Sequence, residues 1–121
     1  MNSEERDKAI RNILSKEFDA KVTKQELEYA KGKMHEFDIV AHTENGLVVG
    51  EIKKNEYGNI NRYYSKKCRI AFDCLLLASI EASRKLMVFT NREFYEHIKE
   101  DLECLISNDI EIRLVEIEQK S

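Results

Sequence analysis

The chain has 121 residues and a formal net charge of −3 at pH 7, and 36% of its residues are charged. This length suits one domain with a single core, and the charge content predicts a heavily ionised surface. No run approaches the ~18 apolar residues that a membrane-spanning helix needs, and the N-terminal MNSEERDK is unlike a signal peptide. We therefore expect a single domain, 1–121, in an intracellular, cytoplasmic protein.

The first predicted element is an amphipathic helix over residues 3–16. Ser3 is a candidate N-cap, and two acids follow it, where they interact favourably with a helix N-terminus. The apolar residues recur at helical spacing, as Ala9, Ile10, Ile13 and Leu14.

The next segment, 18–34, gives conflicting signals. Thr23-Lys24-Gln25-Glu26 fits a capping box and would begin a short helix. Against this, Leu27 and Tyr29 alternate with charged residues, and Lys31-Gly32 fits a turn. We favour an extended segment that pairs with the strands after it.

Residues 34–54 predict a β-hairpin. Apolar and polar residues alternate from Glu36 to Ala41, and a second apolar run begins at Leu47. Asn45-Gly46 lies between the two runs, and these residue types accept the positive φ of a tight hairpin turn.

With Asn45-Gly46 as a two-residue loop, Glu51 would face Val40 and Lys53 would face Asp38. Opposite residues of an antiparallel pair, and alternate residues of one strand, point to the same face. We therefore expect Asp38, Glu51 and Lys53 to converge among apolar neighbours. Two carboxylates and an ammonium would be costly to bury there unless they bind each other, a metal or a substrate.

This cluster suits metal-assisted hydrolysis of a phosphate ester. Asp38 and Glu51 supply oxygen ligands for Mg²⁺ or Mn²⁺, an ion that polarises a phosphate and lowers the pKa of a bound water. Two carboxylates should hold the proton of Lys53 more tightly, so we expect electrostatic stabilisation and positioning from this residue rather than general-base action. The alternative is a solvated cross-strand ion pair, worth ~0.2–1 kcal/mol.

After the hairpin and a loop, a long helix is predicted from Ile60 or Asn61 to about Ser83. Its second half, CLLLASIEA, is apolar around most of its circumference. We expect the surplus apolar face to pack between the sheet and another helix, and the alternative is a dimer contact.

The last elements are a strand, a helix and a strand. Residues 85–90 predict a short buried strand, and 92–106 a helix that Thr90 or Asn91 caps and Ser107-Asn108-Asp109 ends. Residues 110–117 alternate as a strand with Ile110, Ile112 and Leu114 on one face. This spacing implies a right-handed parallel crossover. The predicted fold class is α/β, a central mixed sheet flanked by helices in the order α-β-β-β-α-β-α-β.

Charge is unevenly distributed along the chain. Residues 93–118 carry nine acids against Lys99 and Arg113, whereas residues 52–69 carry one acid, Glu56, among six basic residues. The basic segment directly follows the candidate site, where phosphate contacts would be needed. A solvated helix face explains it equally well. The candidate DNA-binding residues are Lys54, Arg62, Lys66, Lys67 and Arg69.

The cysteines and histidines show no ligand spacing. The three cysteines are expected to be buried reduced thiols, and they are Cys68, Cys74 and Cys104. His35 and His42 belong to the hairpin, and His97 to a later helix. His42 shares the predicted face of Asp38, but an ordinary strand-end residue is the favoured interpretation.

Asp38, the twelve residues after it and then Glu51-Ile52-Lys53 resemble the D…(D/E)xK core of the PD-(D/E)XK nuclease superfamily. This superfamily includes restriction endonucleases and archaeal or viral Holliday-junction resolvases. The resemblance covers Glu36 to Lys53 in motif and most of the chain in outline, with Phe37 where the motif's name has Pro. In the family the Asp and the Glu hold a divalent metal ion, and the Lys assists attack on the phosphodiester.

The resemblance implies a restriction-endonuclease-like fold and a Mg²⁺-dependent endodeoxyribonuclease. The family often places an acid on its first helix, near the metal. Glu5 is the more family-like residue type, whereas Asp7 lies on the apolar face of the helix, and acids that only interact with the helix dipole are the alternative. The implied catalytic residues are Asp38, Glu51, Lys53 and Glu5, with the metal held by Asp38 and Glu51.

Within the family, the small size, the absence of a recognition domain and the hairpin spacing favour the Holliday-junction resolvase type. Such an enzyme acts in DNA recombination as a homodimer on branched DNA. A restriction- or repair-type nuclease subunit, or a non-catalytic nucleic-acid-binding module on the same fold, are the alternatives. An inactive relative is expected to lose a metal ligand, whereas Asp38, Glu51 and Lys53 are all present.

Overall fold

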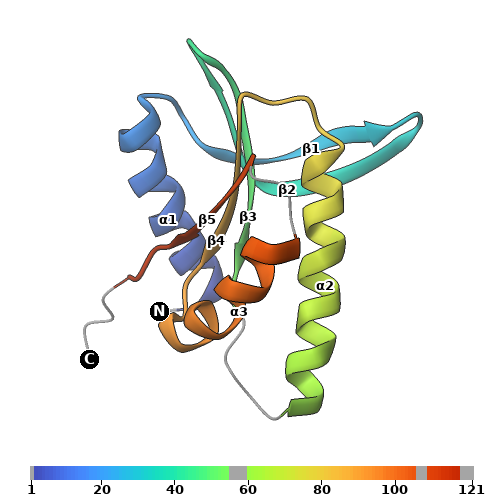
Figure 1. Cartoon of the computed structure of the whole chain (residues 1–121). Helices are drawn as coiled ribbons and strands as arrows, with labels where there is room; N and C mark the ends of the chain where they lie inside the picture. The colour runs from blue at the N-terminus through green and yellow to red at the C-terminus, as the bar shows by residue number, and fades with distance from the viewer. Residues whose placement is uncertain (1, 55–59, 106–108, 118–121) are drawn as a thin grey trace.

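A computed structural model describes residues 2–54, 60–105 and 109–117 (Figure 1). The order of elements confirms the predicted succession of helices and strands. They are α1 (Ser3–Phe18), β1 (Thr23–Ala30), β2 (Lys33–Thr43), β3 (Gly46–Lys53), α2 (Ile60–Ala78), β4 (Arg84–Phe89), α3 (Arg92–Leu105) and β5 (Ile110–Leu114).

The strands form one five-stranded sheet in the order β1-β2-β3-β4-β5. β1, β2 and β3 pair antiparallel, whereas β3, β4 and β5 pair parallel. The two parallel connections run through α2 and α3, and both add the next strand on the same side. Crossovers of one hand then place both helices on one face of the sheet. The fold is therefore α/β with a mixed sheet, as predicted.

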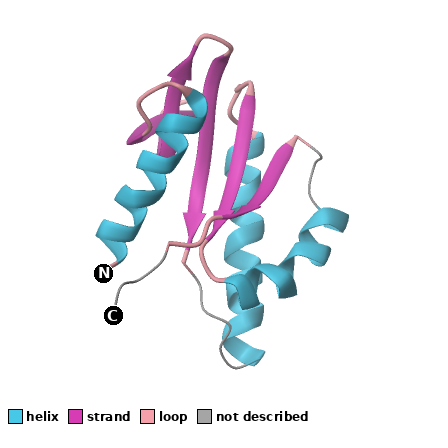
Figure 2. Cartoon of the chain, turned by 90° about the vertical axis from the view of Figure 1, so that its left-hand side faces the viewer, coloured by secondary structure: helices cyan, strands magenta, loops and turns pink. Residues whose placement is uncertain are grey.

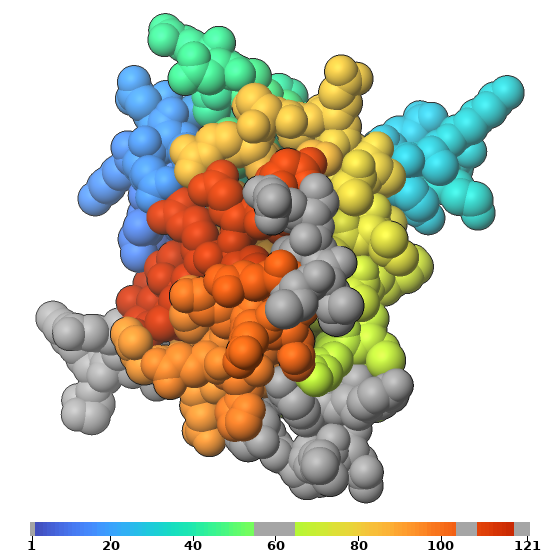
Figure 3. Space-filling view, viewed as in Figure 1, coloured from blue at the N-terminus to red at the C-terminus, as the bar shows by residue number. Residues whose placement is uncertain are grey.

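One face of the sheet packs against α1 and the other packs against α2 and α3, and each face has its own core (Figure 2). On the α1 face, Ile10 and Leu14 pack with Ile39, Val48 and other apolar residues of the strands. On the α2 and α3 face, a larger core joins the strands to both helices, and Ile110, Ile112 and Leu114 all belong to it, as predicted. The β1–β2 hairpin projects from the body of the molecule (Figure 3).

The ambiguous segment after α1 is the strand β1, so the extended prediction is confirmed and the capping-box helix is wrong. Lys31 and Gly32 form the turn to β2, and Gly32 has a φ of +75°. At the start of α1 the N-cap is Asn2 rather than Ser3, because the Asn2 Oδ1 accepts the Glu5 N–H at 2.9 Å.

The predicted hairpin forms, but its observed register is shifted by two residues from the predicted register. The loop is Glu44-Asn45, and Thr43 pairs with Gly46. The Thr43 hydroxyl stabilises this turn, since it donates to the Gly46 carbonyl at 2.7 Å and accepts the Asn45 N–H at 3.2 Å. Val40 therefore faces Val49 rather than Glu51. A shift of two residues leaves every side chain on its predicted face.

α2 ends at Ala78, five residues before the predicted end at Ser83. The chain turns there because Ser83 joins the sheet: its N–H donates to the Leu47 carbonyl at 2.8 Å, which leads directly into β4. The surplus apolar face is not buried as expected, since Phe72 and Leu75 are 58% and 68% exposed.

Three further predictions have mixed outcomes. The cap of α3 is confirmed, because the Asn91 Oδ1 accepts the Phe94 N–H at 2.8 Å. Cys74 is buried, but Cys68 is exposed, and the side chain of Cys104 lies outside the described residues. Most of the predicted end of α3 at 107–109 also lies outside them.

Among the described residues, no helix combines the length and apolar character needed to cross a membrane.

Gly50 is required by the close packing of β3 on β4. A Cβ at this position would lie 2.7 Å from the Leu86 carbonyl oxygen and 3.0 Å from the Leu86 Cβ. We expect Gly50→Ala to lower the free energy of unfolding by about 1–3 kcal/mol, because the backbone must shift to admit the methyl group. Urea unfolding followed by circular dichroism measures this change.

Gly32→Asn is the matched control. Position 32 has open space around it, and asparagine tolerates the left-handed conformation found there. The control should change the free energy of unfolding by less than about 0.5 kcal/mol. Equal effects of the two substitutions would contradict the packing argument.

Candidate active site

A β-bulge in β2 determines where Asp38 lies. β1 pairs Thr23 with Val40 but Gln25 with Phe37, so β2 carries one extra residue between these pairs. Phe37 and Val40 both belong to the core on the α2 and α3 face, which an unbroken strand would not allow for residues three apart. The bulge redirects the side chain of Asp38, which lies between these two residues, as bulges commonly do.

The Asp38 carboxylate replaces a backbone acceptor of the β2–β3 ladder. The paired residues end at Ile39 and Gly50, and in unbroken register Ile52 would pair next with Phe37. Instead, the Asp38 Oδ2 accepts the Ile52 N–H at 2.9 Å. The Arg11 Nε donates to the Asp38 carbonyl at 2.7 Å, which also ties this part of β2 to α1. Asp38 is thus held by hydrogen bonds to β3 and to α1.

Glu51 lies against Asp38 on the same side of the sheet, as predicted. Its side chain is buried, and its Oε1 lies 2.7 Å from the His35 Nε2. Burial raises the pKa of Glu51 to about 9, with further contributions from a hydrogen bond to Asp38 and from the charge of that carboxylate. The charges of Lys53 and Lys24 oppose this rise. Glu51 therefore keeps a proton at neutral pH unless a bound cation displaces that proton.

Lys53 points to the same face and forms an ion pair with Asp73 of α2. Both residues are largely buried, and Cys74 lies close enough for the charge of Lys53 to act on its thiol. Burial lowers the pKa of Lys53 despite the attraction of Glu51 and Asp38. The expectation that neighbouring carboxylates make this lysine hold its proton more tightly is therefore wrong, because loss of hydration outweighs their charge.

The acid of α1 that reaches the sheet is Asp7, not Glu5. Asp7 is buried, and its Oδ2 lies 3.1 Å from the Nζ of Lys54, the residue that follows β3. Its Oδ1 is buried without a hydrogen-bond partner. Glu5 is exposed in the first turn of α1.

The predicted DNA-binding residues are divided among different environments. Lys54 is paired with Asp7, and Lys67 lies 2.5 Å from the Asp101 carboxylate. The Lys66 ammonium lies 5.8 Å from the centre of the Phe94 ring, and Arg69 is exposed. The side chain of Arg62 lies outside the described residues.

Sequence analysis missed two residues of this site, His35 and Asp73. Simple alternation places His35 on the face opposite Asp38, and only the bulge brings both to Glu51. Asp73 carried a signal that could have been used: it is one acid in an otherwise apolar half-helix, three residues after the buried Ile70 and four before the buried Leu77. His42 is exposed near the hairpin turn, in agreement with an ordinary strand-end residue.

The donor chemistry of this site fits a divalent cation held by two carboxylates. Asp38 and Glu51 face each other, and burial, with smaller contributions from the hydrogen bond to Asp38 and from its charge, raises the pKa of Glu51. Oxygen ligands of this kind suit Mg²⁺, which commonly keeps several waters and binds few protein groups. Among the described residues, no three His, Cys, Asp or Glu side chains gather closely enough to share an ion.

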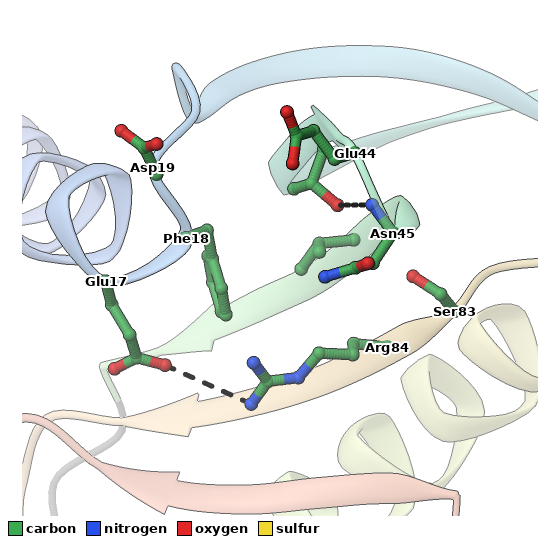
Figure 4. Close-up of a pocket in the computed structure, with 9 residues that line it drawn as sticks. Glu17, Phe18, Asp19, Glu44, Asn45, Ser83 and Arg84 are labelled. Carbon is green, nitrogen blue, oxygen red and sulfur yellow. Dashed lines mark hydrogen bonds and ion pairs between the residues drawn. The ribbon is translucent and has the colours of Figure 1, made fainter.

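A separate hollow of about 460 Å³ lies where β3 and β4 begin, at the other end of β3 from Glu51 (Figure 4). Its lining includes Phe18, Glu44, Asn45 and Arg84. The Arg84 guanidinium is already bound to Glu111 at 2.7 and 2.9 Å and lies 4.7 Å from the centre of the Phe18 ring. No residue predicted for catalysis lines this hollow, so it is distinct from the candidate active site.

Comparisons of the chain with protein-family models, with curated proteins and with solved structures gave no match.

The raised pKa of Glu51 predicts how stability depends on pH. The unfolded carboxyl titrates near 4.5 and the folded one near 9, so between these values the folded protein holds the extra proton. The free energy of unfolding should therefore fall as pH rises through this range. We expect Glu51→Gln, which needs no proton, to have a melting temperature that exceeds that of the wild type by an amount that grows from pH 5 to pH 9.

Thermal melts at several pH values measure this difference, and at pH 9 it should reach at least about 4 °C. Glu36→Gln is the matched control, because Glu36 is an exposed acid on the neighbouring strand, β2. The pH-dependent gain should be absent there. A gain for Glu51→Gln that is the same at pH 5 and pH 9 would contradict the raised pKa.

The Lys53–Asp73 pair predicts a large coupling between two distant positions of the chain. Lys53→Met should lower the free energy of unfolding by about 3–5 kcal/mol, because Asp73 would stay buried without its partner. Lys53→Met with Asp73→Leu should recover most of this loss. Urea unfolding of the four proteins of the double-mutant cycle gives the coupling energy, and additive effects would show that the two side chains do not interact.

Proposed function

We propose that this protein is a metal-dependent DNA endonuclease with a restriction-endonuclease-like fold. The observation that carries the proposal is the pair of facing carboxylates, Asp38 and the buried Glu51, with Lys53 on the same face of β3. A perturbed acid with a specific charge partner marks a functional site more often than chance.

The residues of the site take complementary roles in this proposal. Asp38 and Glu51 would hold Mg²⁺ or Mn²⁺, which when bound supplies positive charge to the phosphate and lowers the pKa of a coordinated water. Lys53 stabilises the negative charge that develops on the phosphate. Asp73 is a positioning residue, because its ion pair holds the Lys53 ammonium against this face of the sheet. His35 orients the Glu51 carboxyl through the contact at 2.7 Å.

The proposed substrate is DNA, and more specifically branched DNA cut by a homodimer of the Holliday-junction resolvase type. The basic first half of α2 follows the site in the chain, and its exposed Arg69 acts electrostatically on Lys53. Phosphate contacts from this helix would orient the backbone without reading bases. The spacing of Asp38 and Glu51 across one hairpin supports the resolvase type.

A non-catalytic nucleic-acid-binding module is the second candidate. The observation that favours it is that Lys53 and Lys54 are both engaged in ion pairs, with Asp73 and Asp7. A structural network would use these residues in the same way and would need no metal. A nuclease of the restriction or repair type, acting as a subunit, shares the proposed chemistry and differs in substrate.

The test incubates labelled four-way junction, flap, duplex and single-stranded DNA with the protein and Mg²⁺ or Mn²⁺. We expect cleavage of the junction in preference to the others. Asp38→Asn, Glu51→Gln and Lys53→Ala should each lower the rate by about 10²–10³-fold or more, because each removes a charge from the transition-state assembly. Glu36→Gln should cleave at the wild-type rate, since this acid is exposed and outside the site.

Titration calorimetry with Mn²⁺ on the same proteins separates the two candidate functions. A nuclease should bind the ion, and Asp38→Asn should weaken that binding. Absence of binding, or binding that Asp38→Asn leaves unchanged, would favour the non-catalytic module. Equal cutting of all four DNA substrates would reject the resolvase type while keeping the nuclease.

A further inference from the structure

The outward face of α2 carries an apolar stripe that this chain does not cover. Phe72 and Leu75 have the highest exposed fractions of the large apolar side chains that the structure describes, 58% and 68%. Cys68 is also exposed, one turn before this pair, and so is Ser79, the residue that directly follows α2 and whose N–H still donates to the Leu75 carbonyl at 3.1 Å. With the helical path continued by one residue to Ser79, the spacing of four, three and four residues puts all four within about 60° of the helix circumference. We call these residues the α2 stripe.

The α2 stripe is complementary to itself under a two-fold rotation. In an antiparallel pair of helices that cross between positions 72 and 75, Phe72 would pack against Leu75 of the second copy. The small Cys68 would then lie opposite Ser79 of that copy, so the large residues fill the centre and the small ones close the ends. Alternating spacings of three and four are those of helices that pack side by side.

Charge favours the antiparallel arrangement over the parallel one. Arg69 is exposed beside the stripe, and the acid within Ser65–Ala78, Asp73, is buried against Lys53. A parallel pair would place the two copies of Arg69 side by side. An antiparallel pair moves each Arg69 towards the C-terminal turn of the other helix, which carries a partial negative charge.

We propose that α2 is the contact between two copies of this chain, antiparallel and centred on Phe72 and Leu75. The choice of a second copy rests in part on the proposed function, because a junction nuclease needs two sites on one substrate. A contact of one helix from each copy is at the low end of interface sizes, below about 1,200 Å² in total. The dimer should therefore dissociate with a constant on the order of micromolar.

Disulfide crosslinking tests the arrangement, because the chain already has Cys68 on the stripe. At an interaxial distance of about 8–10 Å, facing Cα atoms come within the range that a disulfide spans. We expect Ser79→Cys to give a covalent dimer under mild oxidation through Cys68 of one copy and the new cysteine of the other. Cys68→Ser with Ser79→Cys is the control, and it should stay monomeric on non-reducing gels.

The wild-type chain gives a second control. A strong Cys68–Cys68 crosslink would indicate a parallel contact and would overturn the proposal. Equal crosslinking of Ser79→Cys with and without Cys68 would overturn it as well. Circular dichroism of each variant shows whether it is folded, and both changed positions are exposed.

Sedimentation equilibrium measures the same contact without oxidation. Leu75→Lys should raise the dissociation constant by at least about tenfold, whereas Ile13→Lys, at an exposed apolar residue of α1, should leave it unchanged. A wild-type chain that stays monomeric at 100-fold above the expected micromolar constant would overturn the proposal. These readouts do not use cleavage, so a dimer without nuclease activity would refute the proposed function and keep the contact.

Discussion

The site depends on one irregularity of the backbone, the extra residue of β2 at Asp38. Phe37 and Val40 both enter the core on the α2 and α3 face, and this is possible because the strand does not alternate regularly between them. The Asp38 carboxylate then takes the Ile52 N–H that a carbonyl would take in an unbroken ladder. The same bond that completes the sheet holds the carboxylate against Glu51. The Asp38 carboxylate therefore completes the sheet and also belongs to the candidate site.

The electrostatics follow from that placement. Asp38, Glu51 and Asp73 supply three carboxylates, and Lys53 supplies one ammonium, so the four groups have a formal charge of minus two when all are ionised. The surroundings are largely buried, where water cannot screen this charge. A proton on Glu51 reduces this negative charge, and the pKa of Glu51 is raised to about 9. A bound dication would also offset this negative charge, because its charge of +2 is equal in size and opposite in sign to the surplus. The same imbalance links the stability of the protein to pH, and it would link it to the proposed metal.

The sequence was sufficient for features that depend on neighbours along the chain. Alternation and the Asn45-Gly46 turn predicted the hairpin, and the two-residue error in register did no harm because it kept Glu51 and Lys53 on their face. The features it missed depend on contacts between distant segments. His35 reaches Glu51 only through the bulge, and α2 ends early because Ser83 binds β3. The Lys53–Asp73 pair joins a strand to a helix twenty residues later, and no local pattern encodes that packing.

α2 connects the candidate site to the proposed contact between copies. Phe72 lies on the α2 stripe, and the next residue, Asp73, points inward to Lys53. A helix is rigid over one turn, so a second copy packed against Phe72 would also restrain the position of Asp73. The ammonium of Lys53 is held by that carboxylate, and its place in the site is therefore sensitive to whatever covers the opposite side of the helix. The proposed dimer would therefore order the site through the same helix that forms its contact.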